Sequence, residues 1–213
     1  MSNKQIKSKS RVKEHGEVYT NPREVNAMLD LVKNDSYNID STFLEPACGN
    51  GNFLIEILTR KLQTVKEMYK SRDLYEINSI KAIMSIYGVD ILEDNIQECI
   101  DRLYSYWESE YKNKMKRSQN PKAKDVVKYV LSRNILCGNT LTMLNNNGTP
   151  LVFSEWKFIT LTNIKRKDYT LSEMLKSQEI LKSDKSLSYK AENTNKPIKT
   201  YPVCNYLEVI NNV

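Results

Sequence analysis

The sequence predicts an α/β protein built on an open, doubly wound and mostly parallel β-sheet. Short apolar runs alternate along the chain with longer stretches whose apolar residues recur at helical spacing. A turn that contains two glycines joins the first apolar run directly to a helix, and the strand–helix pattern then repeats. Strands that alternate with helices in this way form parallel sheets with helices on both faces.

Length and composition limit the classes of protein that need considering. The 213 residues suffice for one domain with a real core, and 40% hydrophobic and 27% charged residues are typical of a soluble globular protein. No apolar run approaches the roughly 20 residues that cross a bilayer, and none follows the lysine-rich N-terminus. We therefore expect a cytoplasmic protein without membrane association.

The cysteines argue against a metal site. They lie far apart without CxxC spacing, and His15 is the only histidine of the chain. Zinc sites need clustered cysteine and histidine ligands, so we expect no bound metal and reduced, intracellular thiols. The four cysteines are Cys48, Cys99, Cys137 and Cys204.

Three segments differ in character. Residues 1–13 are basic with hardly any apolar residue, which predicts a disordered arm. Residues 14–162 carry the strand–helix pattern and form the expected domain. Residues 163–213 are rich in lysine and serine, and we expect a peripheral extension with one helix over about 171–181.

Within the expected domain, the elements follow in order. Pro22 starts a short amphipathic helix, and a brief buried strand at residues 42–44 leads into the turn. A helix of about four turns begins at Asn52, because apolar residues then recur with a period near 3.6. A second helix covers residues 74–84, and a buried strand at residues 85–91 ends in an acid.

The remaining elements are less regular. Glu93 and Asp94 favour the start of a third long helix. A charged connection at residues 112–124 precedes a short helix and a third strand at residues 134–137. Beyond Gly138 the pattern weakens, and residues 151–161 supply one or two further strands or a hairpin.

The turn itself suggests a nucleotide-like ligand. A strand that delivers Gly-x-Gly into a helix places bare backbone and free N–H groups where ligands of parallel sheets bind. Gly49 and Gly51 are present, but Leu54 replaces the third glycine of the dinucleotide signature, which disfavours a nucleotide-binding oxidoreductase. The nearby acids Glu45 and Asp90 suit a cationic ligand with ribose hydroxyls better than a diphosphate.

The nine residues from Glu45 to Phe53, EPACGNGNF, resemble a motif of the adenine-specific DNA methyltransferases of restriction-modification systems. Upstream, residues 16–20 resemble the segment that in this family closes over the methionine end of S-adenosylmethionine. Downstream, Gly88 to Ile91 match the acidic strand end of the family. The resemblance covers residues 14–142 and implies a Rossmann-like S-adenosylmethionine-dependent methyltransferase fold, with a full or a reduced number of strands.

The resemblance also implies roles for individual residues. Tyr19 and Thr20 would contact the methionine moiety, Asp90 the ribose hydroxyls and Ile91 the adenine face. Asn139 stands where the family has an aspartate that takes the adenine amine, and its amide oxygen can still accept. The turn would cradle the amino-acid part of the cofactor through Glu45, Pro46, Ala47, Cys48, Gly49, Asn50, Gly51 and Asn52.

The acceptor motif of the family is missing. Its members carry Asn or Asp-Pro-Pro-Tyr or Phe at the end of the fourth strand, where the target base is held, and the sequence contains no such string. Three interpretations remain open: an altered acceptor site built from Asn163, Trp156 or Phe158, the cofactor-binding part of a split enzyme, or cofactor binding without chemistry. The catalytic residues are therefore unknown.

The expected function is methyl transfer from S-adenosylmethionine to the adenine amine of DNA, by this chain or by an enzyme of which it is a part. The alternative is a non-catalytic binding or regulatory subunit of a restriction-modification or mobile-element system. Expected partners are DNA and a second methyltransferase or specificity subunit. Residues 165–167, Lys-Arg-Lys, either neutralise DNA phosphates or form a solvated turn.

Overall fold

The computed structural model describes residues 6–176 and 196–212. The chain divides into two compact units between Cys137 and Gly138, whereas the sequence pattern placed a boundary between residues 162 and 163. The structural boundary lies closer to the N-terminus because residues 163–170 pair with the strand before them, so both strands belong to the same small sheet and to the same unit.

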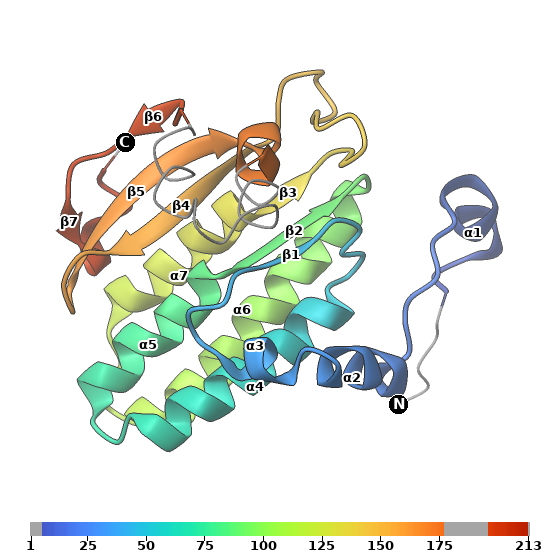
Figure 1. Cartoon of the computed structure of the whole chain (residues 1–213). Helices are drawn as coiled ribbons and strands as arrows, with labels where there is room; N and C mark the ends of the chain where they lie inside the picture. The colour runs from blue at the N-terminus through green and yellow to red at the C-terminus, as the bar shows by residue number, and fades with distance from the viewer. Residues whose placement is uncertain (1–5, 177–195, 213) are drawn as a thin grey trace. The chain divides into compact units, whose positions relative to one another are not determined.

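The first unit contains three strands and seven helices among its described residues (Figure 1). Its strands are β1 (Phe43–Glu45), β2 (Ile86–Asp90) and β3 (Ile135–Cys137). Its helices are α1 (Lys9–His15), α2 (Pro22–Asp30), α3 (Lys33–Tyr37), α4 (Asn52–Met68), α5 (Arg72–Met84), α6 (Glu93–Met115) and α7 (Pro121–Asn134).

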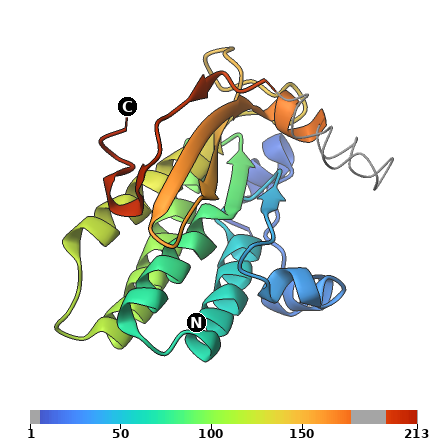
Figure 2. The ribbon, with the colours of Figure 1, turned by 60° about the vertical axis from the view of Figure 1, so that its left-hand side comes forward.

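The three strands form a parallel sheet in the order β1-β2-β3, with Glu45 opposite Gly88 and Asp90 opposite Cys137. Helices α4 to α7 pack against one another on the same side of these strands, and α4, α6 and α7 contact the sheet directly (Figures 1 and 2). The α/β class and the parallel sheet are thus confirmed. A doubly wound sheet needs a reversal of strand order, and the described strands of this sheet show none, because both crossovers advance in one direction.

The core of the first unit lies between these helices and the sheet. The indole of Trp107 stacks on Tyr111 with ring centroids 4.6 Å apart, and its N–H donates to the Ser79 hydroxyl at 3.1 Å. Both rings are fully buried. The residues of β2 from Ile86 to Val89 are buried as well, and the Tyr87 side chain is only 5% exposed. The strand β2, whose end carries Asp90, is thus part of the buried core.

Two segments differ from the sequence-based expectation. Residues 9–15 form α1 where a disordered arm was expected for residues 1–13, because Lys7 and Arg11 pair with acids about 85 residues away; residues 1–5 lie outside the described part. The charged connection expected at residues 112–124 is shorter. Helix α6 continues to Met115, which is buried one turn after Tyr111, and α7 already begins at Pro121.

The second unit is a small antiparallel sheet. Residues 152–158 form the single strand β4 (Val152–Phe158), and its hairpin partner is β5 (Asn163–Thr170), which lies beyond the residues 151–161 where one or two strands or a hairpin were expected. Strands β6 (Lys199–Thr200) and β7 (Cys204–Asn205) pair with the other edge of β5. A short 3-10 helix, η2 (Tyr206–Glu208), follows β7. Residues 171–176 begin the helix expected over 171–181, and the rest of it lies outside the described residues.

The basic run at residues 165–167 is neither a turn nor a cluster of three accessible cations. It lies in β5, where alternation turns Arg166 away from Lys165 and Lys167. Arg166 is only 4% exposed, and its guanidinium donates to Asp168 Oδ2 at 2.7 Å. Its Cζ lies 4.1 Å from the centre of the Tyr201 ring. Arg166 therefore stabilises the sheet and is not available to a phosphate.

None of the helices in the described ranges is both long enough and apolar enough to cross a membrane.

Candidate functional site

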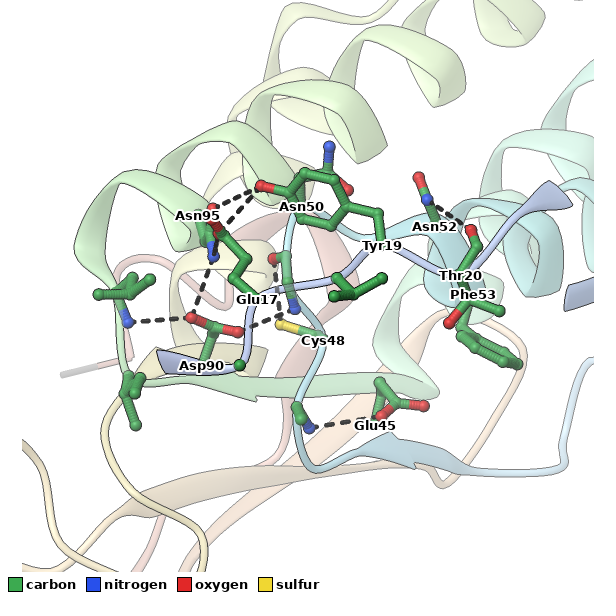
Figure 3. Close-up of a pocket in the computed structure, with 16 residues that line it drawn as sticks. Glu17, Tyr19, Thr20, Glu45, Cys48, Asn50, Asn52, Phe53, Asp90 and Asn95 are labelled. Carbon is green, nitrogen blue, oxygen red and sulfur yellow. Dashed lines mark hydrogen bonds between the residues drawn. The ribbon is translucent and has the colours of Figure 1, made fainter. Parts of the chain in front are cut away.

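A pocket of about 210 Å³ lies at the carboxyl ends of β1 and β2 (Figure 3). The segment at residues 16–20, the glycine turn and the start of α6 contribute its walls. The residues that line it are Gly16, Glu17, Val18, Tyr19, Thr20, Glu45, Ala47, Cys48, Gly49, Asn50, Asn52, Phe53, Asp90, Ile91, Leu92 and Asn95.

The turn has a conformation that only glycine adopts easily. Gly49 and Gly51 have φ values of 52° and 89°, in the left-handed region. A Cβ at Gly49 would lie 3.2 Å from the Tyr19 ring, and one at Gly51 would lie 2.7 Å from Cys99 Sγ. The turn is fixed to β2, because Cys48 N donates to Val89 O at 2.8 Å. Glycine thus permits the close packing of the turn against Tyr19 on one side and against Cys99 of α6 on the other.

Asp90 ties three parts of the site together. Its Oδ2 accepts from Gly49 N at 3.0 Å, and its Oδ1 accepts from Leu92 N at 2.9 Å and from Asn95 Nδ2 at 3.3 Å. A carboxylate offers about four lone pairs, so these bonds leave room for a ligand donor. The carboxylate is thereby held in one orientation at the pocket wall.

Asn95 links Asp90 to the N-terminal segment. Its Nδ2 also donates to Glu17 Oε1 at 2.7 Å, while its Oδ1 accepts from Tyr19 Oη at 3.1 Å (Figure 3). Burial alone would raise the pKa of Glu17, but bonds from Arg11, Asn95 and Tyr19 outweigh it and lower that pKa. Burial, together with the bond to Glu17, raises the pKa of Tyr19 to about 12. Glu17 is thus ionised and Tyr19 neutral at physiological pH.

One buried side-chain nitrogen or oxygen lacks a partner in the part of the chain that the structure describes, namely Asn50 Oδ1. The Nδ2 of the same side chain donates to Glu98 Oε1 at 2.8 Å. Arg102 holds the backbone beneath it by donating to Asn50 O at 2.6 Å and to Asn52 Oδ1 at 3.0 Å. An unsatisfied buried acceptor costs free energy. A ligand donor such as an ammonium group would satisfy it.

The electrostatics of the pocket favour a cation. Three carboxylates line it, on Glu17, Glu45 and Asp90, and none of the described lining residues is lysine, arginine or histidine. Of these three carboxylates, Arg11 pairs with Glu17 alone, through Nε at 2.6 Å. Burial raises the pKa of Glu45, and the bond that it accepts from Ala47 N partly opposes this shift. A phosphate group would meet repulsion here without a compensating side-chain cation.

The buried Cys48 thiol in the turn has no nucleophilic character. Contact with the Cys99 thiol, and then burial, raise the pKa of Cys48 well above its usual range. A thiol is reactive as the thiolate, and a raised pKa keeps Cys48 protonated. The Cys48 side chain instead packs between the turn and Gly88.

Most residues that the sequence assigned to the site line one pocket: Tyr19, Thr20, Glu45, Ala47, Cys48, Gly49, Asn50, Asn52, Asp90 and Ile91. Pro46 and Gly51 shape the turn without lining the pocket. Sequence reasoning missed the contributions of Glu17 and Asn95. Asn95 lies one helical turn before Cys99 on the buried stripe of α6, and a polar residue on an apolar stripe was the available signal.

Asn139 belongs to the second unit. Its side-chain oxygen accepts from Leu141 N at 2.9 Å and Thr142 N at 3.4 Å, so it caps a turn there. Of the residues considered for an altered acceptor site, Trp156 and Phe158 are half-buried on one face of β4 and Asn163 is exposed at the start of β5.

Comparison with protein-family models, with characterised proteins and with solved structures finds no match. Within the described residues, no three or more histidine, cysteine, aspartate or glutamate side chains are grouped so as to hold a metal ion.

Proposed function

We propose that the pocket binds S-adenosylmethionine and that the chain is a DNA methyltransferase of the adenine amino type, or the cofactor-binding part of one. The observation that supports this cofactor is the charge of the pocket. Three carboxylates line the pocket around the glycine turn, and none of the described lining residues is cationic. S-adenosylmethionine bears a sulfonium and an α-ammonium group, whereas dinucleotides bear a diphosphate.

The side chains present fit this ligand. Asp90 would accept from the ribose hydroxyls, and the exposed side chain of Ile91 would cover the adenine ring. The buried, unpartnered Asn50 Oδ1 would accept from the α-ammonium group. When bound, the cofactor supplies an electrophilic methyl group, and the residues around it position that group for attack.

The acceptor is assigned as DNA adenine from the EPACGNGNF motif, and the net charge of +6 is compatible with a polyanionic partner. The alternative is a non-catalytic S-adenosylmethionine-binding or regulatory subunit of a restriction-modification or mobile-element system. It is favoured by one observation, the absence of adjacent prolines anywhere in the sequence, and so of the acceptor tetrapeptide.

Calorimetric titration with S-adenosylmethionine tests the cofactor. We expect Asp90→Ala to raise the Kd about 10- to 100-fold, as for loss of a hydrogen bond to a charged group. Asp90→Asn keeps the shape of the side chain and one acceptor oxygen, so it separates an effect on binding from an effect on folding. Asp101→Ala removes an exposed acid of α6 and serves as the matched control. Absence of binding at millimolar ligand, or an Asp90→Ala variant that binds like wild type, would overturn the assignment.

Transfer of a tritiated methyl group to DNA then tests the reaction, first with the purified chain and then with the protein encoded beside it. Labelling by the chain alone supports a complete enzyme, and labelling only by the mixture supports a split one. If the cofactor binds and neither sample labels DNA, the non-catalytic alternative is correct.

A further inference from the structure

The end of the first unit that lies farthest from the pocket is basic. Helices α4 and α6 both begin at the pocket, which Asn52 and Asn95 of their first turns line, and both run away from it. Helix α4 has 17 residues and carries the chain about 25 Å, at a rise of roughly 1.5 Å per residue. The connection that follows α4 therefore lies on the far side of the unit from the pocket.

The connections that follow α4 and α6 meet at this end (Figure 1). Arg72, at the start of α5, donates from Nη1 to the Ser118 hydroxyl at 2.9 Å. Lys114 Nζ, near the end of α6, donates to Lys70 O at 2.9 Å. These two bonds hold the connections side by side, so their side chains form one surface.

Residues 66–72 and 112–124 form this surface, the basic end, on which cations strongly outnumber acids. Residues 112–124 contain six lysines and arginines and no acid, and residues 66–72 add three cations and one acid. Glu108, one turn before this stretch, pairs with Lys112 at 2.8 Å and with Lys124 at 3.2 Å. Six other cations pair with no acid among the described residues, and all but the half-buried Lys114 are exposed: Lys66, Lys70, Arg72, Lys114, Lys116 and Arg117.

The helix dipoles account for only part of this charge. Cations near the C-terminus of α6 are favoured by the negative end of its dipole, whereas the N-terminus of α7 favours acids. The first turn of α7 has no acid and carries Lys122 and Lys124. Lys116 has a φ of 56°, in the left-handed region that favours glycine. The sequence thus keeps a charge where glycine would be relaxed, and a bound polyanion would offset the repulsion among these cations.

We propose that the basic end binds the phosphate backbone of duplex DNA, as a contact separate from the pocket. The charges are spread over two connections and two helix ends, which suits a polymer of regularly spaced anions better than one small anion. Its described residues include no exposed aromatic ring on which a single strand would stack. Met68 is the one exposed large apolar side chain among them, whereas a membrane-binding surface presents several. The choice of DNA over RNA rests on the proposed function, and the phosphate contact does not.

Fluorescence anisotropy with a labelled duplex of about 20 G·C pairs tests the contact, because this duplex offers no adenine to the pocket. We expect it to bind with or without S-adenosylmethionine. Lys116→Gln combined with Arg117→Gln should raise the Kd about 10- to 50-fold at about 0.1 M salt, and should lower the slope of log Kd against log salt by about 2, as for loss of two phosphate contacts. Arg23→Gln combined with Lys33→Gln removes the same charges from exposed positions of α2 and α3 and should leave both quantities unchanged.

Two further variants separate the contact from other effects of the substitutions. Lys66→Gln combined with Arg72→Gln should weaken binding to a similar extent, because both connections contact the same duplex. Lys116→Gly should weaken binding about 5- to 10-fold, as for loss of one phosphate contact, while the urea midpoint stays the same or rises, since glycine relieves the left-handed backbone.

Unchanged affinity in Lys116→Gly, or an equal loss of affinity in the control with Arg23 and Lys33 replaced, would overturn the basic end as a DNA contact. Tighter binding to single strands of the same length, or to vesicles that contain phosphatidylserine, would refute duplex recognition in favour of that partner. Tighter binding of duplex RNA would refute the choice of DNA. If the duplex binds through the basic end and S-adenosylmethionine does not bind at millimolar concentration, the proposed function fails and the phosphate contact stands.

Discussion

Replacing Gly51 by alanine separates backbone strain from crowding in the glycine turn. At φ 89° an L-residue is strained, and the new Cβ would lie 2.7 Å from Cys99 Sγ on the buried face of α6. The left-handed conformation costs about 1–2 kcal/mol, and the stiffer unfolded chain returns about 0.4–1 kcal/mol. Overpacking adds about 1–3 kcal/mol. We therefore expect Gly51→Ala to lower the free energy of unfolding by about 2–4 kcal/mol.

Gly16 provides the matched control, because it lies in the same unit with φ 65° and a Cβ there would meet nothing within 4 Å. Gly16→Ala should cost about 1 kcal/mol, from strain alone. Urea unfolding followed by far-UV circular dichroism measures both, since helices dominate this unit. In a Cys99→Ala background the clash disappears, so the cost of Gly51→Ala should fall to that of Gly16→Ala. Equal costs for the two glycine variants in the wild-type background, or an unchanged Gly51→Ala cost without the Cys99 thiol, would refute this reasoning.

Two further predictions concern buried cations. Burial lowers the pKa of Lys61 to about 7, against the opposing influence of Asp40 and Asp35. Below pH 7 the Lys61 amine is protonated in both the folded and the unfolded chain, and the full cost of burying its charge is present. Between pH 7 and 10.5 the amine stays protonated in the unfolded chain but loses its proton in the folded one. The free energy of unfolding of wild type relative to Lys61→Met should therefore rise with pH over this range, by at most about 1.4 kcal/mol per pH unit. Urea titrations across this range measure the difference, and a flat or falling one would contradict the assignment. In the second unit, Arg166→Met leaves the buried Asp168 without its cation and should cost about 3 kcal/mol in thermal or urea unfolding, whereas adding Asp168→Leu should recover most of that loss. A double variant no more stable than Arg166→Met would show that the ion pair is not the cause.

Some residues of the site can be predicted from the local sequence pattern, and others cannot. The glycines and the carboxylate at the end of β2 were readable, because turn geometry and strand ends are local properties of the chain, whereas the segment at Tyr19 was implied only by its resemblance to a family segment. Asn95 and Arg102 were not, since their importance depends on which side chains α6 brings against the turn. The same holds for Arg166: the sequence shows a cation between two lysines, and only strand pairing places it beside Asp168 and Tyr201.

The sequence by itself determined the order of strands and helices from α4 to β3, the strand–turn–helix unit and the chemical character of the turn, because hydrophobic periodicity and backbone freedom act over a few residues. Only the tertiary structure decided that the strands run β1-β2-β3 without reversal, that β5 belongs to a separate small sheet, and that the basic N-terminal segment lies against acids of α6. These features depend on contacts between residues far apart in the chain. Whether Lys7 and Arg11 belong to a disordered arm or to an ordered segment is set by where Asp94 and Glu98 lie in space.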